Sequence, residues 1–432
     1  MQYTKLLYPA LQYVALSKEY SAMTRRQRMF YFIRFSGLGL VVGVAYIDPG
    51  NWGTDIAAGS KFGYSLLWVV VMSNVIGMFM QYLSSKLGII TGFSLAENCR
   101  DNLSKSKSFF LWITAEIAII ATDLAEVVGA AIAFYLLFGI PLIYGAIITG
   151  LDTLLILGLE RIGIRKVESI IVGMMVLIAS IYLLEIYLSS PDGTQIAYHA
   201  IVPELQSGSV VIAVGILGAT VMPHAIFLHS AMMKTRKSMF EILKYPKRII
   251  KFSTVDTIFA LSVAGLINGA ILVMSAATFH QNNIVIESIE AAYETLTPLL
   301  GNVSSTAFGI ALLASGLASS VVATLSGQII FEGFTKFKAK LWQRKIVIRT
   351  ITIIPAIIAI YYGVNTLDIL VISQVILSLQ LPFTIIPLVY FTSKEKIMGK
   401  EYVNRTHTKI IAVIAVSIII ILNVLLLNYM FS

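Results

Sequence analysis

The sequence has few charged residues. Asp, Glu, Lys and Arg make up 13% of its 432 residues, whereas hydrophobic residues make up 57% and the mean hydropathy is +0.83. A soluble domain needs more charge than this to cover its surface, so the composition indicates a chain dissolved in a lipid bilayer. The short alternating segments of a membrane β-barrel are absent as well. We therefore predict an all-α polytopic membrane protein.

Cysteine is scarcer still, since Cys99 is the only one. A single thiol excludes an intrachain disulfide and a thiolate metal cluster. The sequence also lacks the G-x-x-x-x-G-K-[ST] phosphate loop of a primary pump and the H-E-x-x-H motif of many metalloenzymes. The first 30 residues contain no short apolar core with a cleavage site, so we expect no removable signal peptide. No resident cofactor is predicted.

Long apolar runs are what the sequence does contain. A run of about 20 apolar residues spans the hydrocarbon core as a helix. No linker or low-complexity tract divides the chain, which predicts one polytopic domain with its core at 37–391. Interrupted spans, described below, would head two five-helix halves of this core, about 37–188 and 209–391. A cytoplasmic segment at 1–36 precedes it, and an accessory helix at 408–430 follows. We predict eleven transmembrane helices: 37–58, 64–88, 109–135, 138–158, 168–188, 209–233, 252–274, 303–333, 348–363, 366–391 and 408–430.

Lys and Arg are unevenly distributed along the chain, whose net charge is +9. The connections at 189–208 and 275–302 contain neither residue, and Lys61 is the one clear exception on that side. This positive-inside pattern predicts a cytoplasmic N-terminus and, after eleven spans, a C-terminus on the opposite side. We expect the protein in the plasma membrane, with that C-terminus extracellular. The basicity therefore reports topology and contact with the lipid bilayer, and predicts no nucleic-acid partner. The basic clusters are Arg25–Arg34, Arg100–Lys107, Arg161–Lys166, Lys234–Lys251, Lys336–Lys345 and Lys394–Lys409.

Two of the predicted spans are interrupted by proline near their middles. The first contains Asp48-Pro49-Gly50-Asn51, and the sixth contains Met222-Pro223-His224. Proline removes a backbone donor, and in lipid a broken helix survives only where protein or a water-lined cavity satisfies the freed carbonyls. Breaks at matching positions of two halves are typical of the midplane binding site of inverted-repeat transporters. The alternative is that both prolines are ordinary kinks.

The residues at the two breaks form a candidate cation site. Asp48 brings a carboxylate to mid-span, where an unpaired charge is costly, and Asn51 adds a neutral oxygen. The facing break offers the carbonyl of Ala219 and the thioether of Met222. Hard ions such as Mg²⁺ and Ca²⁺ prefer oxygen alone, whereas a thioether favours softer transition metals. The set predicts Mn²⁺, Fe²⁺ or a similar ion, and the alternative for Met222 is simple packing.

Further short motifs occur along the chain after the first break. They are Gln81–Gly88 with Thr91-Gly92, Asp123–Glu126, Gly327-Gln328 with Glu332–Phe334, and Ser373-Gln374 with Leu381–Phe383. Together with the two breaks, this ordered set resembles the Nramp family of divalent-metal transporters over nearly the whole chain. The resemblance implies a LeuT-type fold with a 5+5 inverted repeat and unwound helices 1 and 6. It also implies proton-coupled import of Mn²⁺ and Fe²⁺, with Cd²⁺ and Co²⁺ as further ions.

The resemblance also implies site residues. Asp48, Asn51, Met222 and the Ala219 carbonyl bind the ion, and Gln374 joins them in some states. Pro49, Gly50 and Pro223 shape the two breaks. One departure from the family pattern is the segment 316–320, where Gln is expected after Gly316. We expect this segment to lie away from the ligands.

Protons need titratable groups of their own. Glu116, Asp123 and Glu126 form a stripe about 80° wide on the predicted third helix, which favours a proton relay. His224 lies beside the second break, and histidine changes charge near neutral pH. The alternative is that the acids form structural ion pairs.

Basic and polar residues remain to be assigned. The family pattern suggests that Arg349 pairs with the acids, and Arg344 is the rival candidate. We interpret His229 as a hydrogen-bonded packing residue that tunes the site. No role is assigned to Gln81, Asp152 or Asp256.

Other functions remain open alternatives. The runner-up is a small-molecule or amino-acid transporter of the same fold, although Asp48 would repel a substrate carboxylate at that break. A channel would not require two broken helices, and a membrane metalloenzyme would have little use for a thioether ligand. The chain is predicted to be a transporter and not an enzyme, with metal ions, protons and lipid as partners and no obligatory protein partner.

Overall fold

The computed structural model describes residues 38–150, 164–234, 246–338 and 340–431. The predicted cytoplasmic segment 1–36 lies outside these residues. The first part of the chain folds into α4 (Leu38–Ala45), α5 (Pro49–Phe62), α6 (Leu67–Thr91), α7 (Leu95–Asn102), α8 (Lys105–Phe138), α9 (Leu142–Thr149) and α11 (Ile164–Ser189).

The second part of the chain is also helical. It contains α12 (Gly193–His199), α13 (Val210–Thr220), α14 (Pro223–Lys234), α16 (Pro246–Thr278), η1 (His280–Asn282), α17 (Ile289–Leu300), α18 (Asn302–Thr335), α19 (Leu341–Tyr361), α20 (Thr366–Thr392), α21 (Glu395–Met398) and α22 (Thr406–Phe431). The predicted all-α class is therefore confirmed. The connections at 189–208 and 275–302 contain the short helices α12 and α17. Neither helix is a long apolar run, so neither was predicted as a span.

Eight helical segments in the described part of the chain are long and apolar enough to cross a membrane. Of the other three predicted spans, the first is divided into α4 and α5, and the fourth is only partly described. The ninth, α19, contains Arg344, Lys345 and Arg349. It begins at Leu341 and not at 348, because the buried side chains of Lys345 and Arg349 are part of the helix and do not end it. The count of eleven stays a prediction.

Both predicted breaks are present. Helix α4 ends at Ala45 and α5 begins at Pro49, whereas α13 ends at Thr220 and α14 begins at Pro223. Side chains from other helices bind the carbonyls that the first break exposes: Asn268 on α16 donates to the Tyr46 carbonyl at 2.8 Å, and Ser315 on α18 donates to the Ile47 carbonyl. The unwound backbone is thus hydrogen-bonded by protein, as the bilayer interior requires.

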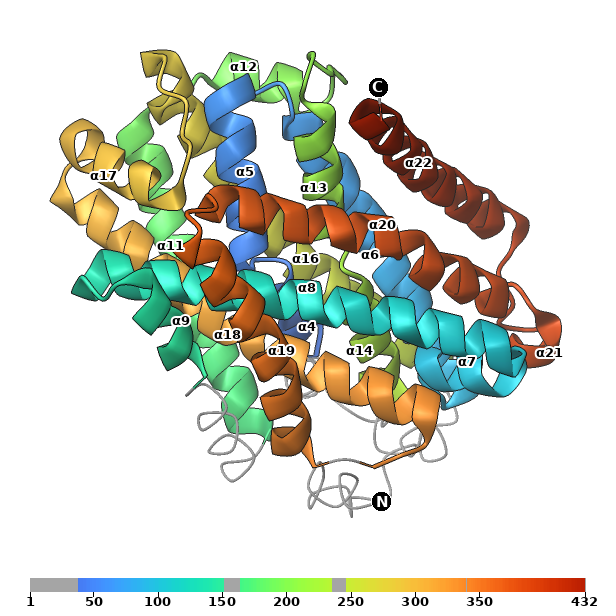
Figure 1. The fold of residues 1–432 in the computed structure, drawn as a ribbon. Helices are drawn as coiled ribbons and strands as arrows, with labels where there is room; N and C mark the ends of the chain where they lie inside the picture. The colour runs from blue at the N-terminus through green and yellow to red at the C-terminus, as the bar shows by residue number, and fades with distance from the viewer. Residues whose placement is uncertain (1–37, 151–163, 235–245, 339, 432) are drawn as a thin grey trace, which may run out of the picture.

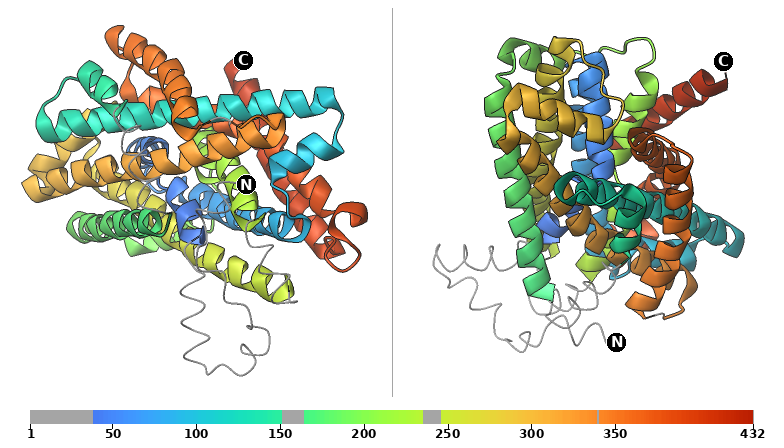
Figure 2. Two further views of the ribbon diagram at one scale, coloured as in Figure 1. Left: turned by 90° about the horizontal axis from the view of Figure 1, so that it is seen from below. Right: turned by 60° about the vertical axis from the view of Figure 1, so that its left-hand side comes forward.

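The broken helices lie inside the bundle. Helices α4 and α5 run through its middle, α8 and α20 cross in front of them, and α22 lies at one side (Figure 1, Figure 2). Corresponding members of the two halves pack on each other, with α6 on α16, α8 on α18 and α5 on α13. Pairing of this kind places both breaks at the centre of the molecule.

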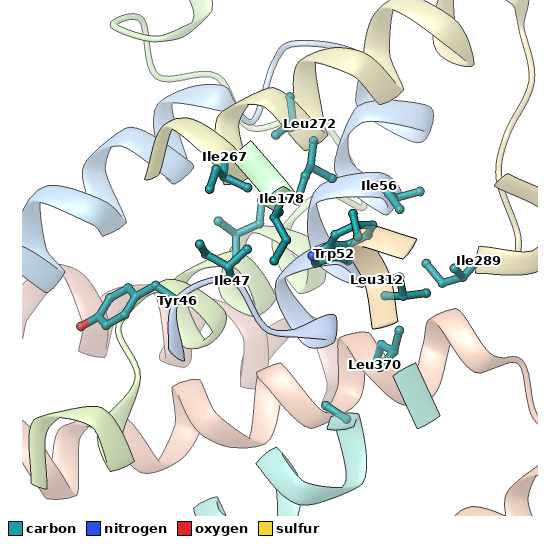
Figure 3. Close-up of a cluster of buried hydrophobic side chains, with 14 of the residues drawn as sticks. Tyr46, Ile47, Trp52, Ile56, Ile178, Ile267, Leu272, Ile289, Leu312 and Leu370 are labelled. Carbon is teal, nitrogen blue, oxygen red and sulfur yellow. The ribbon is translucent and has the colours of Figure 1, made fainter. Parts of the chain in front are cut away.

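Large apolar side chains surround the first break. Tyr46 and Trp52 are fully buried and point in different directions from the unwound segment (Figure 3). The Trp52 ring makes edge contacts with Tyr182 on α11 and Phe308 on α18, with ring centroids 5.1 and 5.2 Å apart. Aromatic contacts of this geometry fix the orientation of α5 against two neighbouring helices.

Close backbone contact joins α6 to α14. A Cβ atom at Gly88 would lie 2.0 Å from the Ser230 carbonyl oxygen, so only glycine permits this approach. Ser230 in turn accepts a hydrogen bond from the Leu95 backbone N–H at 2.9 Å, which joins α7 to the same contact.

We expect Gly88→Ala to force α6 and α14 apart and to lower the free energy of unfolding by about 1–3 kcal/mol, the usual cost of overpacking. The matched control is Gly173→Ala, because a Cβ there meets no atom within 4 Å. It should be neutral or stabilise its helix by up to about 1 kcal/mol. Thermal unfolding in detergent measures both variants, and equal melting temperatures would contradict the proposed close contact.

Candidate metal centre

The two breaks meet at Gly77 on α6. A Cβ at this position would lie 3.1 Å from the Tyr46 ring and 3.5 Å from the Thr220 carbonyl oxygen. Around this point α13 packs against α5, and α14 packs against α4. Residues far apart in the sequence are thereby brought to one place, which is where the sequence predicts the ion ligands.

Asp48 is the N-cap of α5 and is fully buried. Its Oδ1 accepts a hydrogen bond from the Asn51 backbone N–H at 2.8 Å. Its Oδ2 has no hydrogen-bond partner among the described residues, and no ion pair there involves Asp48. A buried carboxylate without a cation is costly, so this oxygen is suited to bind one.

Gln374 reaches the same break from α20. A Cβ on Gly50 would lie 1.7 Å from the Gln374 Nε2, so the side-chain amide occupies the space that this glycine leaves. The Nε2 donates to the Ser373 hydroxyl at 3.0 Å, while the Oε1 has no partner within the described part of the chain. Its buried, unpartnered carbonyl oxygen is therefore a second candidate ligand atom beside Asp48.

The second break supplies the remaining candidates. In a continuous helix the Ala219 carbonyl would accept a hydrogen bond from the N–H of residue 223, but Pro223 has none. Ala219 and Met222 are both fully buried, and Met222 belongs to the apolar cluster that also contains Ile47. The break therefore leaves a carbonyl free for a ligand and holds a thioether beside it.

The predicted ligands form a site of low charge. Asp48 is its one carboxylate, and the other donors are neutral. In the residues described here, no group of three or more His, Cys, Asp or Glu side chains is arranged to hold a metal ion. A site with one carboxylate, neutral oxygens and one soft thioether suits an ion that is bound and then released.

Asp123 forms a second polar centre, between α8 and α19. Its Oδ1 pairs with Lys345 Nζ at 3.0 Å and with Arg349 Nη1 at 3.2 Å, and its Oδ2 accepts from the Thr352 hydroxyl. The Ser320 hydroxyl on α18 accepts from both cations, at 3.1 and 3.0 Å. All five residues are buried, so two cationic side chains and one carboxylate lie inside the protein.

The other acids of the predicted stripe differ from Asp123. Glu116 is partly exposed, pairs with Arg344 and accepts from the Trp112 indole at 2.7 Å. Both arginine candidates are thus engaged, Arg349 with Asp123 and Arg344 with Glu116. Glu126 is buried one turn beyond Asp123. The structure brings Arg349 to Asp123 and leaves Glu116 in a separate ion pair.

Two histidines connect the second break to its neighbours. His224 Nδ1 lies 3.3 Å from the Thr122 hydroxyl, and Thr122 precedes Asp123 on α8. His229 Nδ1 lies 2.9 Å from Gln81 Oε1, and Gln81 donates to the Tyr46 hydroxyl at 2.9 Å. His229 is thus hydrogen-bonded, as predicted. Its partner is Gln81, to which we assigned no role from the sequence. Its tuning of the site stays a prediction.

The segment 316–320, which is expected to lie away from the ligands, is close to the first break. Ser315, immediately before it, donates to the Ile47 carbonyl, and a Cβ on Gly316 would lie 3.7 Å from Pro49. Ser320 contacts the two cations of the Asp123 centre. The segment therefore joins the first break to the Asp123 centre, because α18 packs along both α4 and α8.

Lys345, Thr352 and Ser320 were missed by the sequence analysis. Lys345 was counted as part of a cytoplasmic basic cluster that reports topology. Its spacing to Arg349 and Thr352 is i, i+4 and i+7, which places all three on one helix face. That periodicity was the available signal, although it does not say which helix the face meets.

Comparison with known proteins agrees with this geometry. The Nramp family, described as natural resistance-associated macrophage protein-like, matches residues 39–428. The divalent metal cation transporter MntH of Caldanaerobacter subterraneus subsp. tengcongensis is 46% identical over 397 residues, which cover 92% of this chain and 93% of that protein.

Solved structures agree as well. A structure of the Eremococcus coleocola manganese transporter, in complex with an aromatic bis-isothiourea substituted compound, has a TM-score of 0.83 and 35% identity, covering 93% of this chain and 88% of that chain. The closed form of Mhp1, a nucleobase-cation-symport-1 family transporter, has a TM-score of 0.60 at 13% identity, with 82% and 77% covered. The second likeness shows the fold alone, which is the LeuT type with unwound helices 1 and 6. The chain therefore belongs to the Nramp family, a family of membrane transporters and not of enzymes.

Proposed function

We propose that this chain imports divalent transition-metal ions, Mn²⁺ and Fe²⁺ among them, together with protons across the plasma membrane by alternating access. One observation carries the proposal. At the crossing of two broken helices, the Asp48 Oδ2 and the Gln374 Oε1 are buried without partners in the described part of the chain, and Pro223 frees the Ala219 carbonyl. The names of the relatives, a divalent metal cation transporter and a manganese transporter, support the same substrate class.

The ligands would act by replacing the water shell of the ion. Asp48 supplies the one formal charge, and Asn51, Gln374 and the Ala219 carbonyl supply neutral oxygens. The thioether of Met222 favours Mn²⁺, Fe²⁺, Co²⁺ and Cd²⁺ over Ca²⁺ and Mg²⁺, which gain little from sulfur. With a single carboxylate the ion is attracted strongly enough to enter and weakly enough to leave on the other side.

Protons would use the polar groups of α8. His224 touches Thr122, the neighbour of Asp123, so a proton path would lead from the second break towards the Asp123 centre. A recess between α8, α18 and α19 is lined by Asp123, Lys345 and Arg344. Arg344, at this recess, pairs with Glu116. Asp123, Glu126, His224, Arg349 and Glu116 are therefore the proposed proton-handling residues.

A small-molecule substrate is disfavoured at this site. Mhp1 shares only the fold, at 13% identity. An anionic substrate would meet the unpaired Asp48 carboxylate and the apolar Met222 side chain. We further propose that the N-terminus is cytoplasmic and that α22 ends outside, because Lys and Arg are absent from 189–208 and 275–302.

The direct test is metal uptake by the purified chain in liposomes. We expect Mn²⁺ influx to rise when an inward proton gradient is imposed, and Asp48→Ala to reduce influx by about 100-fold or more, since it removes the only formal charge among the ligands. Asp101→Ala, on the partly exposed pair with Arg100, is the matched control and should transport normally. If folded Asp48→Ala protein imported Mn²⁺ at a near-normal rate, the assignment of Asp48 as an ion ligand would be refuted.

Met222→Ala separates a sulfur ligand from a packing residue. If the thioether binds the ion, Cd²⁺ affinity should fall by about 10-fold or more while Ca²⁺ affinity changes little, because Ca²⁺ prefers oxygen. Calorimetric titration of both ions on one preparation measures the ratio. Met80→Ala is the control, as Met80 is fully buried in a different apolar cluster. A Cd²⁺ to Ca²⁺ affinity ratio that does not change in Met222→Ala would refute the sulfur ligand.

Asp123→Asn tests the proton path. The substitution keeps the shape but removes the titratable group and the partner of two buried cations, so proton influx during Mn²⁺ transport should fall severalfold while Mn²⁺ affinity changes less. A pH-sensitive dye inside the liposomes measures this. Glu401→Gln, which removes an exposed carboxylate paired with Lys247, is the control. Unaltered acidification in Asp123→Asn vesicles would show that protons travel by another route.

A further inference from the structure

Helix α22 contains one buried polar side chain amid apolar residues. Asn423 is 6% exposed, and the other buried residues of α22 are Ala412, Ala415, Ile419, Leu422 and Leu426. The opposite face of the helix presents apolar residues such as Val424 and Ile421. A buried amide in an apolar membrane helix is costly unless it makes specific hydrogen bonds.

Both ends of the Asn423 amide bond to one residue of α20. Its Nδ2 donates to the Ser378 carbonyl at 2.8 Å, and its Oδ1 accepts from the Ser378 hydroxyl at 3.0 Å. Ser378 is itself fully buried. The donor and the acceptor of the Asn423 amide are therefore both satisfied by Ser378.

The Ser378 carbonyl needs an outside donor. In a regular helix it would accept from the N–H of residue 382, but that residue is Pro382, inside α20. A carbonyl without a donor is expensive in the apolar interior of a membrane protein. Asn423 thus takes the place of the hydrogen bond that Pro382 removes.

Ser378 is also linked to the ion site. It lies one helical turn beyond Gln374 on α20. On the facing helix, a Cβ at Gly218 would lie 2.0 Å from the Gln374 carbonyl oxygen and 2.6 Å from the Ser378 backbone nitrogen. The backbones of α20 and α13 are therefore in direct contact immediately before Ala219. Helix α22 packs against both of them.

We propose that Asn423 is a positioning residue for the ion site. By completing the hydrogen bonding of α20 at Ser378, it holds Gln374 and, through the Gly218 contact, the Ala219 carbonyl in the geometry that binds the metal. The accessory helix α22 thereby sets the affinity of a site that it does not touch. This inference rests on the proposed function of Gln374 and Ala219 as ligands.

Restoring the missing backbone donor tests this role. We expect Asn423→Ala to weaken Mn²⁺ binding by about 10-fold, since it leaves a buried carbonyl without a donor. Pro382→Ala returns an N–H to position 382, so in that background Asn423→Ala should change the Mn²⁺ dissociation constant by less than about 2-fold. Val424→Ala, on the apolar exposed face next to Asn423, is the matched control and should bind normally. Calorimetry with Mn²⁺ measures the four members of the cycle, and melting temperatures are recorded for each.

Two outcomes would overturn the inference. One is the absence of rescue by Pro382→Ala. This would appear as an equal loss of Mn²⁺ affinity from Asn423→Ala with and without Pro382→Ala or, if Asn423→Ala alone is too unstable to purify, as a double variant that is equally unstable. The other is an unchanged Mn²⁺ affinity with a lower melting temperature, which a purely structural role predicts. Gln374→Ala tests the proposed ligand on which the inference rests. If Gln374→Ala weakens Mn²⁺ binding and Asn423→Ala does not, the positioning role of Asn423 fails while the proposed function stands. If the wild-type chain binds no Mn²⁺, the proposed function fails with it.

Discussion

The structure depends on the need to satisfy backbone carbonyls that unwound segments and helix prolines leave without a donor within the bilayer. Three such places are met in different ways. Side chains from other helices cap the Tyr46 and Ile47 carbonyls beside Pro49, and Asn423 caps the Ser378 carbonyl ahead of Pro382. At Pro223 the freed Ala219 carbonyl lies beside Met222, at the crossing of the broken helices. A helix break in lipid must be repaired by protein or used to bind something polar. The first solution is seen at Tyr46, Ile47 and Ser378, and the second is the one proposed for Ala219.

Two of the buried acids, Asp48 and Asp123, illustrate opposite solutions to one electrostatic problem. Asp123 lies between Lys345 and Arg349, so its charge is balanced by the protein itself. Asp48 forms no ion pair within the described residues and keeps one oxygen without a partner there. Removing a charge from water is costly in both cases, but only at Asp48 is the compensation left to come from outside the chain. If Asp48 binds the metal as proposed, a resident counterion there would compete with the ion. At Asp123 the ion pairs keep two cations and a carboxylate together.

Much of this arrangement could be predicted from the sequence, because its strongest signals are local. The apolar runs predict the helices, and Pro49 and Pro223 predict both breaks. Contacts between helices were harder to predict from the sequence. Nothing local in the sequence shows that Arg344 meets Glu116 while Arg349 meets Asp123, since a helical period assigns a face and not the neighbour of that face. The surroundings of the segment 316–320 were hidden for the same reason, because its proximity to Pro49 and its contact with the Asp123 centre join helices far apart in the chain.

The solitary cysteine has a practical consequence. Cys99 on α7 is buried, and burial raises the pKa of its thiol, so hardly any reactive thiolate forms there at neutral pH. The natural chain is therefore almost equivalent to a cysteine-less background. A cysteine introduced on either side of the breaks would be the dominant target of a thiol-reactive label. The rate of its modification would report when water reaches that position, and so which half of the pathway is open at each stage of the transport cycle.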